Sequence, residues 1–247
     1  MKHRALTRGG TLAAAFVGAA TLLGFHLAGA LVLFAFYVPS VALSRLPHPH
    51  AERIRDVDKQ GPRDARQVLA NGGVAAVAAL VAFFFPQAHA VAATAFLGAF
   101  AAASADTWGT EIGTRYGSNA RSVLGFRRAT AGLSGGVTTL GTLAEFAGAA
   151  IVAATAALAA FAPFIAGAVG GIIGAFADSL LGASVQERRT CDRCACDCET
   201  DPHLCGAPTR RIRGLSGFRN DAVNGSSTFV GACASIAVLA LRAHYFP

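Results

Sequence analysis

The chain has 247 residues, of which 53% are hydrophobic and only 14% are charged, and its formal net charge is +7. A soluble domain usually carries about a quarter charged residues, so this composition argues against an ordinary soluble enzyme. The positive charge does not indicate nucleic-acid binding, because the Lys and Arg residues are divided among loops between apolar runs. We therefore expect an integral membrane protein whose partner is the lipid bilayer, with no nucleic-acid partner.

Four apolar stretches define the expected membrane segments. Residues 11–44, 71–104 and 222–241 contain no Asp, Glu, Lys or Arg, and residues 129–177 contain only Glu145. A spanning helix needs roughly 20 apolar residues, so each stretch holds one or two passes. The alternative, buried helices of a soluble protein, fits runs of this length less well.

Each of the three long stretches is divided at its least helical point. These points are Phe25-His26, residues 86–89 and Ala162-Pro163, because proline disfavours helix at the preceding residue and polar side chains mark the first two corners. With a final helix over 226–241, the division predicts an all-α polytopic membrane protein of about seven short transmembrane helices, or six if the first stretch is one helix. Several segments would have about 15 residues, or about 22 Å of helix. The whole chain would form a single membrane domain.

The N-terminus also has the charge pattern of a signal peptide. Lys2, Arg4 and Arg8 precede an apolar run, and residues 28–30 could form a cleavage site. Because the apolar run continues to Leu43, we expect a retained first helix.

The Lys and Arg residues set the expected orientation. With the N-terminus inside, the loops 45–67, 106–128 and 187–221 lie on the cytoplasmic side, and with the N-terminal tail they hold every Lys and Arg except Arg242. Positive residues accumulate on this side of membrane proteins. We expect a multi-pass protein of the cell (inner) membrane with three main cytoplasmic loops.

The first loop is basic and leads into a new helix. Lys59 and Arg63 could hold phosphate oxygens, and Gly61 permits close approach of the backbone to a ligand. Asn71 follows as a further polar group. The alternative is a solvated basic loop that only sets the topology.

The second loop opens with Asp106 and Glu111, two carboxylates that directly follow an apolar run. Carboxylates near phosphates commonly hold Mg²⁺, which keeps several waters and takes one or two protein ligands. The alternative is a polar helix cap.

Arg127 then precedes Gly135 and Gly136, in a glycine-rich stretch that leads into the next helix. A helix N-terminus that follows such a stretch is a natural anion site. The alternative is a flexible turn that permits close helix packing.

Further acids lie inside or beside the membrane segments. Glu145 and Asp178 occupy predicted helices, each roughly 14 Å from the same membrane face, and intramembrane acids are functional candidates by default. The alternative is a structural pair in which each acid has an interhelical donor. Near the last helix, Asp221 and Asn224 would share one helical face and could form another oxygen site.

The third loop, residues 187–221, is rich in cysteine. Cys191 and Cys194 form a Cys-x₂-Cys pair, and His203 and Cys205 follow as His-x-Cys, which are plausible ligands for tetrahedral Zn²⁺. The neighbouring cysteines at 196 and 198 make the ligand set ambiguous, and unmetallated thiols are the alternative.

Five motifs occur in order along nearly the whole chain: QVLANG at 67–72, ADTWGTEIG at 105–113, GGV at 135–137, DSLLGA at 178–183 and NDAVN at 220–224. In these motifs the chain resembles the integral membrane family named domain of unknown function ninety-two, which includes plant and cyanobacterial phytyl-phosphate kinases. The resemblance implies phosphorylation of a prenyl monophosphate to the diphosphate by a nucleoside triphosphate. Glu145 and the cysteines at 196 and 198 lie outside the family pattern.

The residues and the resemblance together predict a membrane-embedded phosphotransferase that uses Mg²⁺ and a nucleoside triphosphate on a phytyl-like prenyl monophosphate. The lipid chain would lie between small-residue helices, with its phosphate at the cytoplasmic face. The catalytic acids, expected also to bind Mg²⁺, are Asp106, Glu111, Asp178 and Asp221. The expected phosphate-binding residues are Lys59, Arg63, Asn71, Arg127, Gly135, Gly136 and Asn224. The possible structural Zn²⁺ would be bound by Cys191, Cys194, His203 and Cys205.

Two other classes of function fit part of the pattern. A secondary transporter of a small or anionic solute would explain intramembrane acids and the short repeat of residues 105–107 and 177–179. The polar side chains cluster toward one face, however, which favours an enzyme. A non-catalytic scaffold with a zinc-bearing loop would leave Glu145 and Asp178 unexplained. The sequence sets no oligomeric state.

Overall fold

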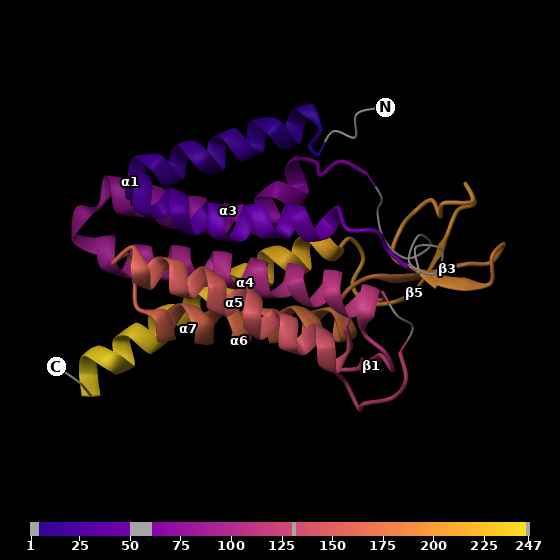
Figure 1. Cartoon of the computed structure of the whole chain (residues 1–247). Helices are drawn as coiled ribbons and strands as arrows, with labels where there is room; N and C mark the ends of the chain where they lie inside the picture. Colours follow the sequence, from indigo (N-terminus) through magenta and orange to yellow (C-terminus); the bar gives the residue numbers. More distant parts are fainter. Residues whose placement is uncertain (1–4, 50–60, 130–131, 246–247) are drawn as a thin grey trace.

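The computed structural model describes residues 5–49, 61–129 and 132–245. These residues include six helices that are long and apolar enough to cross a membrane, and the helices pack side by side in one bundle (Figure 1). The predicted all-α polytopic membrane fold is confirmed. The helices are α1 (Arg8–Ser44), α3 (Ala65–Phe84), α4 (His89–Tyr116) with the short helix η1 (Pro86–Ala88) before it, α5 (Thr139–Leu158), α6 (Phe164–Ser184) and α7 (Asn220–Tyr245).

Helix α1 reverses direction at His26, as the sequence predicts. His26 has φ 50° and ψ −140°, outside the helical region. The Thr7 amide donates to the Arg63 carbonyl at 3.1 Å, and Arg63 Nη2 donates to Ser44 Oγ at 3.3 Å. A straight helix of 37 residues would be about 55 Å long, so its two ends could not both meet Arg63. α1 is therefore a hairpin of two arms (Figure 1), and the described chain has seven long helical segments.

The other two predicted turns are also confirmed. η1 forms the turn between α3 and α4. α5 ends at Leu158, and α6 begins directly after Pro163, which is its N-cap residue. All three turns lie at the same end of the bundle, opposite the long loops (Figure 1).

Two helix boundaries differ from the prediction. α4 has 28 residues and ends at Tyr116, so residues 106–116, which were predicted to begin the second loop, form its last turns. α7 begins at Asn220 and has 26 residues, whereas a start at 226 was predicted. The helices continue through charged residues because these side chains line a cavity rather than lipid. α3, α5 and α6 have 20 or 21 residues, so these segments are longer than the expected 15 or so.

α4 lies at the centre of the bundle and contacts every other long helix. Its packing depends on small residues. A Cβ atom added to Gly98 would overlap Ser235 Oγ and the Gly231 carbonyl of α7, and a Cβ atom added to Gly170 of α6 would approach the same two groups. Ser235 Oγ donates to the Ala166 carbonyl at 2.8 Å. Helices in lipid associate through such small residues because their backbones can approach closely.

Aromatic side chains fill the half of the bundle that lies away from the long loops. The rings of Phe25, Phe96 and Phe161 meet edge to face, with centroids 4.9 to 5.7 Å apart. Phe36 stacks on Phe100 with centroids 5.3 Å apart. These side chains join α1, α4 and the turn between α5 and α6, and they close this half of the bundle with apolar atoms.

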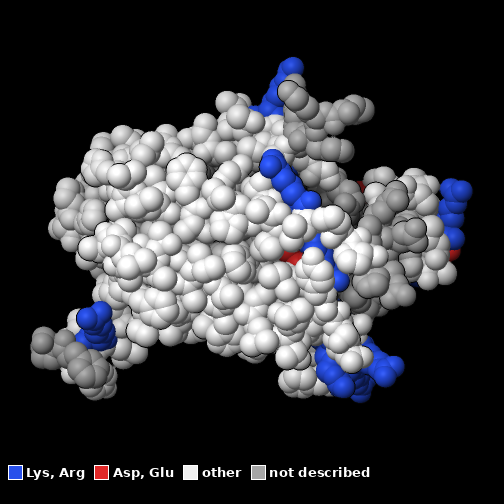
Figure 2. Space-filling view, viewed as in Figure 1, with Lys and Arg blue, Asp and Glu red and all other residues white. Residues whose placement is uncertain are grey.

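The outer surface of the bundle is apolar. Large aliphatic side chains such as Leu12, Leu27 and Leu158 are 72% to 89% exposed. Figure 2 shows a broad belt without charged residues, with Lys and Arg gathered mainly toward the loop end. Such a surface suits hydrocarbon, in which helices satisfy their own backbone hydrogen bonds.

The long loops gather at the other end of the bundle and contain short strands (Figure 1). β1 (Arg121–Ser122) pairs antiparallel with β2 (Gly136–Val137). In the third loop, β3 (Arg188–Cys191) pairs antiparallel with both β4 (Cys196–Cys198) and β5 (Arg210–Arg213). The described parts of the three long loops thus lie at one end of the bundle, as predicted. Their cytoplasmic orientation stays a prediction.

Cysteine labelling tests the predicted orientation. We expect a Leu158→Cys variant, with the new thiol in the α5–α6 turn, to react in intact cells with a maleimide that cannot cross the membrane. A Leu124→Cys variant, in the second loop, should react only after permeabilisation, because its charge-rich loop lies in the cytoplasm. Both leucines are exposed at the protein surface, 89% for Leu158 and 47% for Leu124, so neither new thiol would be buried inside the protein. Labelling of Leu124→Cys, but not of Leu158→Cys, in intact cells would reverse the orientation.

Candidate functional site

A polar cavity of about 520 Å³ lies at the loop end of the bundle. Every long helix contributes to its lining, and so do the glycine-rich stretch before α5 and the third loop. The cavity brings together most of the site residues that the sequence predicts. Those that line it are Arg63, Asn71, Asp106, Glu111, Gly135, Gly136, Asp178, Asp221 and Asn224.

Acidic side chains dominate the cavity. Its described lining contains six carboxylates, against the two arginines Arg63 and Arg115. Four of these acids come from four different helices: Asp106 from α4, Glu145 from α5, Asp178 from α6 and Asp221 from α7. The others are Glu111 of α4 and Glu199 of the third loop. Such a concentration of like charge beside lipid is costly unless cations or donors compensate it.

Asp178 lies at the centre of the acidic group. It lies within electrostatic reach of Asp106, Glu145 and Glu199. In the amide orientation that satisfies its neighbours, Asn224 Nδ2 donates to Asp178 Oδ2 and to the Asn220 carbonyl, each at 3.2 Å. Asn224 was predicted to bind substrate phosphate, but in this structure it holds a carboxylate.

Glu145 enters the cavity because α4 and α5 approach each other closely. A Cβ atom added to Gly109 of α4 would lie 2.5 Å from Glu145 Cγ and 2.8 Å from its Oε1. One turn further along α4, a Cβ atom added to Gly113 would lie 3.1 Å from Thr138 Oγ1. Thr138 is the N-cap of α5, where its hydroxyl accepts the Gly141 amide at 3.0 Å. The small residues of the ADTWGTEIG motif therefore set the depth of Glu145 in the site.

Both oxygens of Glu111 are engaged by neighbouring side chains. Oε2 forms an ion pair with Arg115, and Oε1 accepts the Ser44 hydroxyl at 2.5 Å. Arg115 is buried and also donates to the Leu46 carbonyl at 3.3 Å. Arg63 Nη2 donates to the same Ser44 hydroxyl at 3.3 Å. Glu111 thus joins the end of α1 to α4, so a positioning role suits it better than the predicted Mg²⁺ ligation.

The glycine-rich stretch is fixed by two independent contacts. Gly135 has φ +82°, and a Cβ atom there would lie 2.5 to 2.6 Å from the Cβ, Cα and N atoms of Ala183 in α6. Glu199 accepts the Ser134 amide at 2.8 Å and the Ser134 hydroxyl at 2.9 Å. The second oxygen of Glu199 also accepts Gln186 Nε2 at 2.7 Å. The stretch is therefore a held loop at the cavity wall rather than a flexible turn.

Two predicted phosphate ligands are not placed in the cavity. Arg127 lies in the turn between β1 and β2, where it is exposed and its carbonyl accepts the Ser122 amide at 2.8 Å. It does not line the cavity, so the structure places Arg127 outside the candidate site. Lys59 lies outside the described residues.

Three functional candidates were missed. Glu145 was noticed in the sequence but left out of the predicted site, and Arg115 and Glu199 were not considered. The Glu111-to-Arg115 spacing of four residues indicates an ion pair once α4 is extended to Tyr116. No sequence pattern indicates Glu199, which reaches the cavity only through the fold of the third loop.

The third loop also brings its predicted zinc ligands together. One side-chain ligand atom from each of Cys191, Cys194, His203 and Cys205 lies within 4.8 Å of the others. His203 Nδ1 lies 3.2 Å from Cys205 Sγ, and this contact, with help from the Ala207 amide, lowers the pKa of Cys205 to about 6. Zn²⁺ itself stays a prediction.

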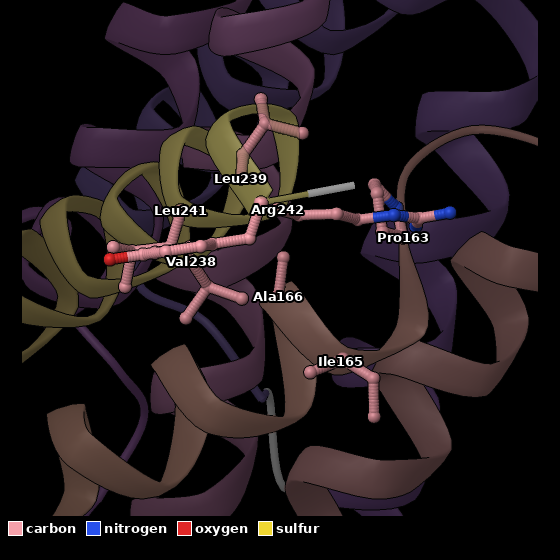
Figure 3. A pocket seen from close by; sticks show the side chains of 8 residues that line it. Pro163, Ile165, Ala166, Val238, Leu239, Leu241 and Arg242 are labelled. Atoms are coloured by element: carbon pink, nitrogen blue, oxygen red, sulfur yellow. The ribbon is translucent and has the colours of Figure 1, made fainter. Parts of the chain in front are cut away.

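A second cavity, of about 760 Å³, lies at the opposite end of the bundle between the start of α6 and the end of α7 (Figure 3). Its lining is mainly aliphatic, with Arg242 and Tyr245 as the polar members. The described lining contains no carboxylate, thiol or imidazole. Although it is larger, its described lining lacks the carboxylate, thiol and imidazole groups that bind metals, so the acidic cavity is the candidate functional site.

These features define a multi-pass integral membrane protein with an acidic cavity at one end of its helical bundle. The chain belongs to the family described as integral membrane protein DUF92, whose profile matches residues 1–232. It is 28% identical over 189 residues to an uncharacterized membrane protein of Methanocaldococcus jannaschii, covering 76% of this chain and 77% of that protein.

Two further relatives come from photosynthetic organisms. The chain is 26% identical over 227 residues to Protein PGR of Arabidopsis thaliana, covering 79% of this chain and 76% of that protein. It is 25% identical over 215 residues to an uncharacterized membrane protein of Synechocystis, covering 85% of this chain and 73% of that protein. No solved structure matches the chain.

Proposed function

We propose that the protein is a membrane-embedded phosphotransferase that converts a phytyl-like prenyl monophosphate to the diphosphate, with Mg²⁺ and a nucleoside triphosphate. One observation carries the proposal. Acids from four helices line the same cavity as a held glycine-rich loop and the N-terminus of α5. Acids suit a cation, and the loop and helix N-terminus suit a phosphate.

The excess of carboxylates is the reason for proposing a cation. A phosphate alone would be repelled by six acids, so an anionic substrate would bind together with Mg²⁺. Asp106, Asp178 and Asp221 are the proposed ligands, of which Mg²⁺ would take one or two directly and keep waters on its other positions. Glu111 is proposed as a positioning residue, because Arg115 and Ser44 already occupy its oxygens.

Phosphoryl transfer requires positioning and charge neutralisation more than covalent chemistry by the protein. An oxygen of the prenyl monophosphate would attack the terminal phosphorus of the nucleotide. The bond from that phosphorus to its bridging oxygen would break, and the nucleoside diphosphate would leave with the bridging oxygen. Mg²⁺ would neutralise the charge on the transferred group, and Arg63 at the cavity wall would hold a phosphate oxygen.

The position of the cavity relative to the membrane suits a lipid substrate. The cavity opens at the loop end of a bundle whose outer surface is apolar, so a lipid phosphate could keep its chain beside the helices and its head in the cavity. The chain has no Gly-x₄-Gly-Lys-Ser/Thr motif, so the nucleotide would bind without a P-loop. We propose the inner membrane with the loops in the cytoplasm, where nucleoside triphosphates are available.

The test is transfer of labelled phosphate by the purified protein. Nucleoside triphosphates labelled at the γ position would be incubated with geranyl, farnesyl, geranylgeranyl or phytyl monophosphate in detergent. We expect label in a prenyl diphosphate, and we expect a chelator of Mg²⁺ to stop its formation. No transfer with any pair, together with uptake of prenyl phosphate or another anion into proteoliposomes, would instead favour a transporter. The aromatic closure of the other half of the bundle argues against that second outcome.

A further inference from the structure

The cysteine-rich loop folds as a compact unit around its predicted ligands. Cys191 ends β3 and pairs with Cys196 at the start of β4. Cys194 lies in the turn between these two strands, close to Cys191. The chain then returns through His203 and Cys205 before it enters β5. Two turns thus bring three sulfur atoms and one imidazole to one point.

A network of hydrogen bonds holds the returning segment in place. Arg189 of β3 donates to Asp201 Oδ2 at 2.9 Å and to Thr209 Oγ1 at 2.6 Å. Asp201 Oδ1 in turn accepts the Thr209 amide at 3.1 Å and the Thr209 hydroxyl at 3.0 Å. These hydrogen bonds help to position the segment that carries His203 and Cys205.

Two distances in the cluster are close to those of a tetrahedral zinc centre. Zn–S bonds of about 2.3 Å place two tetrahedral sulfur ligands about 3.8 Å apart. Cys191 Sγ and Cys205 Sγ are 3.6 Å apart, and His203 Nδ1 is 3.2 Å from Cys205 Sγ. A disulfide would need sulfur atoms about 2.05 Å apart, and it would leave the imidazole in the cluster unexplained.

The other ring nitrogen of His203 resolves the role of Cys196. Nε2 of His203 lies 3.7 Å from Cys196 Sγ, on the far side of the ring from Cys205. A histidine that binds a metal through one nitrogen usually offers the other to a hydrogen-bond partner. Cys196 therefore fits the role of this outer partner, whereas Cys191, Cys194 and Cys205 fit the role of sulfur ligands.

We propose that Cys191, Cys194, Cys205 and Nδ1 of His203 bind one Zn²⁺, and that this ion fixes the hairpin that places Glu199 in the acidic cavity. Glu199 follows β4 directly. Its carboxylate holds the Ser134 amide and hydroxyl and the Gln186 amide at 2.7 to 2.9 Å. Release of the ion would loosen this hairpin and, through Glu199, the glycine-rich loop. Metal binding does not depend on the proposed phosphotransferase activity.

Metal content and Co²⁺ spectroscopy of the full-length purified protein test the metal site. We expect about one Zn²⁺ per chain, and Co²⁺ in its place should give the visible bands of a tetrahedral site with thiolate charge-transfer absorption. In competition with a chelator, Cys194→Ser should bind Zn²⁺ at least about tenfold more weakly. Cys196→Ser should keep the ion, and so should the control Cys233→Ser, whose cysteine lies on α7. Wild-type protein without zinc, and without thiolate bands in Co²⁺, would overturn the site.

Hydrogen exchange tests the connection to the cavity without any assay of activity. After chelation, we expect the amides of residues 196–205 and 132–136 to lose protection together, because Glu199 joins the two segments. A Glu199→Gln variant that still binds zinc should lose protection only at 132–136. Unchanged protection at 132–136 after removal of the ion would overturn the connection, even if the zinc site itself is present.

Discussion

Replacement of Asp106 by Asn is expected to lower turnover of a prenyl monophosphate by about 100-fold or more, equivalent to about 2.7 kcal/mol of transition-state stabilisation. Asn keeps the shape of the side chain but removes one negative charge from the cation site. Asp106 lines the cavity with Asp178 and Asp221, so its loss should weaken Mg²⁺ binding where the phosphates meet. The measurement is turnover at several Mg²⁺ concentrations, with folding checked by size-exclusion chromatography in detergent.

The matched control is Asp192→Asn. Asp192 also lies at the loop end of the protein, but its side chain is 75% exposed, and Oδ1 lies 3.6 Å from Arg210 Nη2. This substitution removes the same charge outside the cavity, so turnover should change less than about twofold, because surface ion pairs contribute little. Near-normal turnover of Asp106→Asn, or an equal loss in both variants, would contradict the assignment of Asp106 to the cation site.

Replacement of Gly135 by Ala is expected to produce the second large effect. Gly135 has φ +82°, and its added Cβ would lie 2.5 to 2.6 Å from atoms of Ala183, two of them backbone atoms, so either the loop or α6 must move. The strain of the left-handed conformation and the overlap together should lower the free energy of unfolding by about 3 kcal/mol. The displaced loop should also lower turnover. The measurement is unfolding by denaturant in detergent together with the kinase assay.

Gly125→Ala separates the two causes. Gly125 has φ +77°, but nothing lies within 4 Å of an added Cβ atom there. This variant should therefore carry the conformational strain alone, about 1 kcal/mol, and keep normal turnover. Equal losses of stability in Gly125→Ala and Gly135→Ala would contradict the close packing of the glycine-rich loop on α6.

Much of the fold could be predicted from local chemistry. The turns at His26, Pro86 and Pro163 were predicted because each interrupts a long apolar run with a polar side chain or a proline, and such interruptions depend on nearby residues alone. The gathering of the long loops at one face followed from the distribution of Lys and Arg. Both features are encoded in short windows of sequence.

The ends of α4 and α7 could not be predicted in the same way. Charged residues at 106–116 were interpreted as loop because a helix that faces lipid would exclude them. In the folded bundle they face a cavity that other helices complete, so α4 continues to Tyr116. Glu111 then pairs with Arg115 on the same helix, which no interpretation of residues 106–128 as a loop could reveal.

The sequence predicted most of the acids of the candidate site. It did not predict the residues whose position depends on the tertiary structure. Asp106, Asp178 and Asp221 stand out because acids in or beside apolar helices are rare. Arg127 looked suitable because a basic residue precedes a glycine-rich stretch, but its exposed side chain does not line the cavity. Glu199 reaches the cavity only because the hairpin of β3 and β4 carries it there. Contacts between distant segments determine whether Arg127 and Glu199 reach the cavity.

Mn²⁺ is the most direct probe of the proposed site, in which acids from several helices hold a divalent cation against a lipid phosphate. Mn²⁺ prefers the same octahedral oxygen ligands as Mg²⁺, and its electron spin reports phosphorus bound through one oxygen. With Mn²⁺ and phytyl monophosphate, we expect the wild-type protein to bind the ion and to show hyperfine coupling to ³¹P, and we expect Asp178→Asn to lose both signals. Mn²⁺ bound without ³¹P coupling, or bound equally well by Asp178→Asn, would contradict a shared cation–phosphate site.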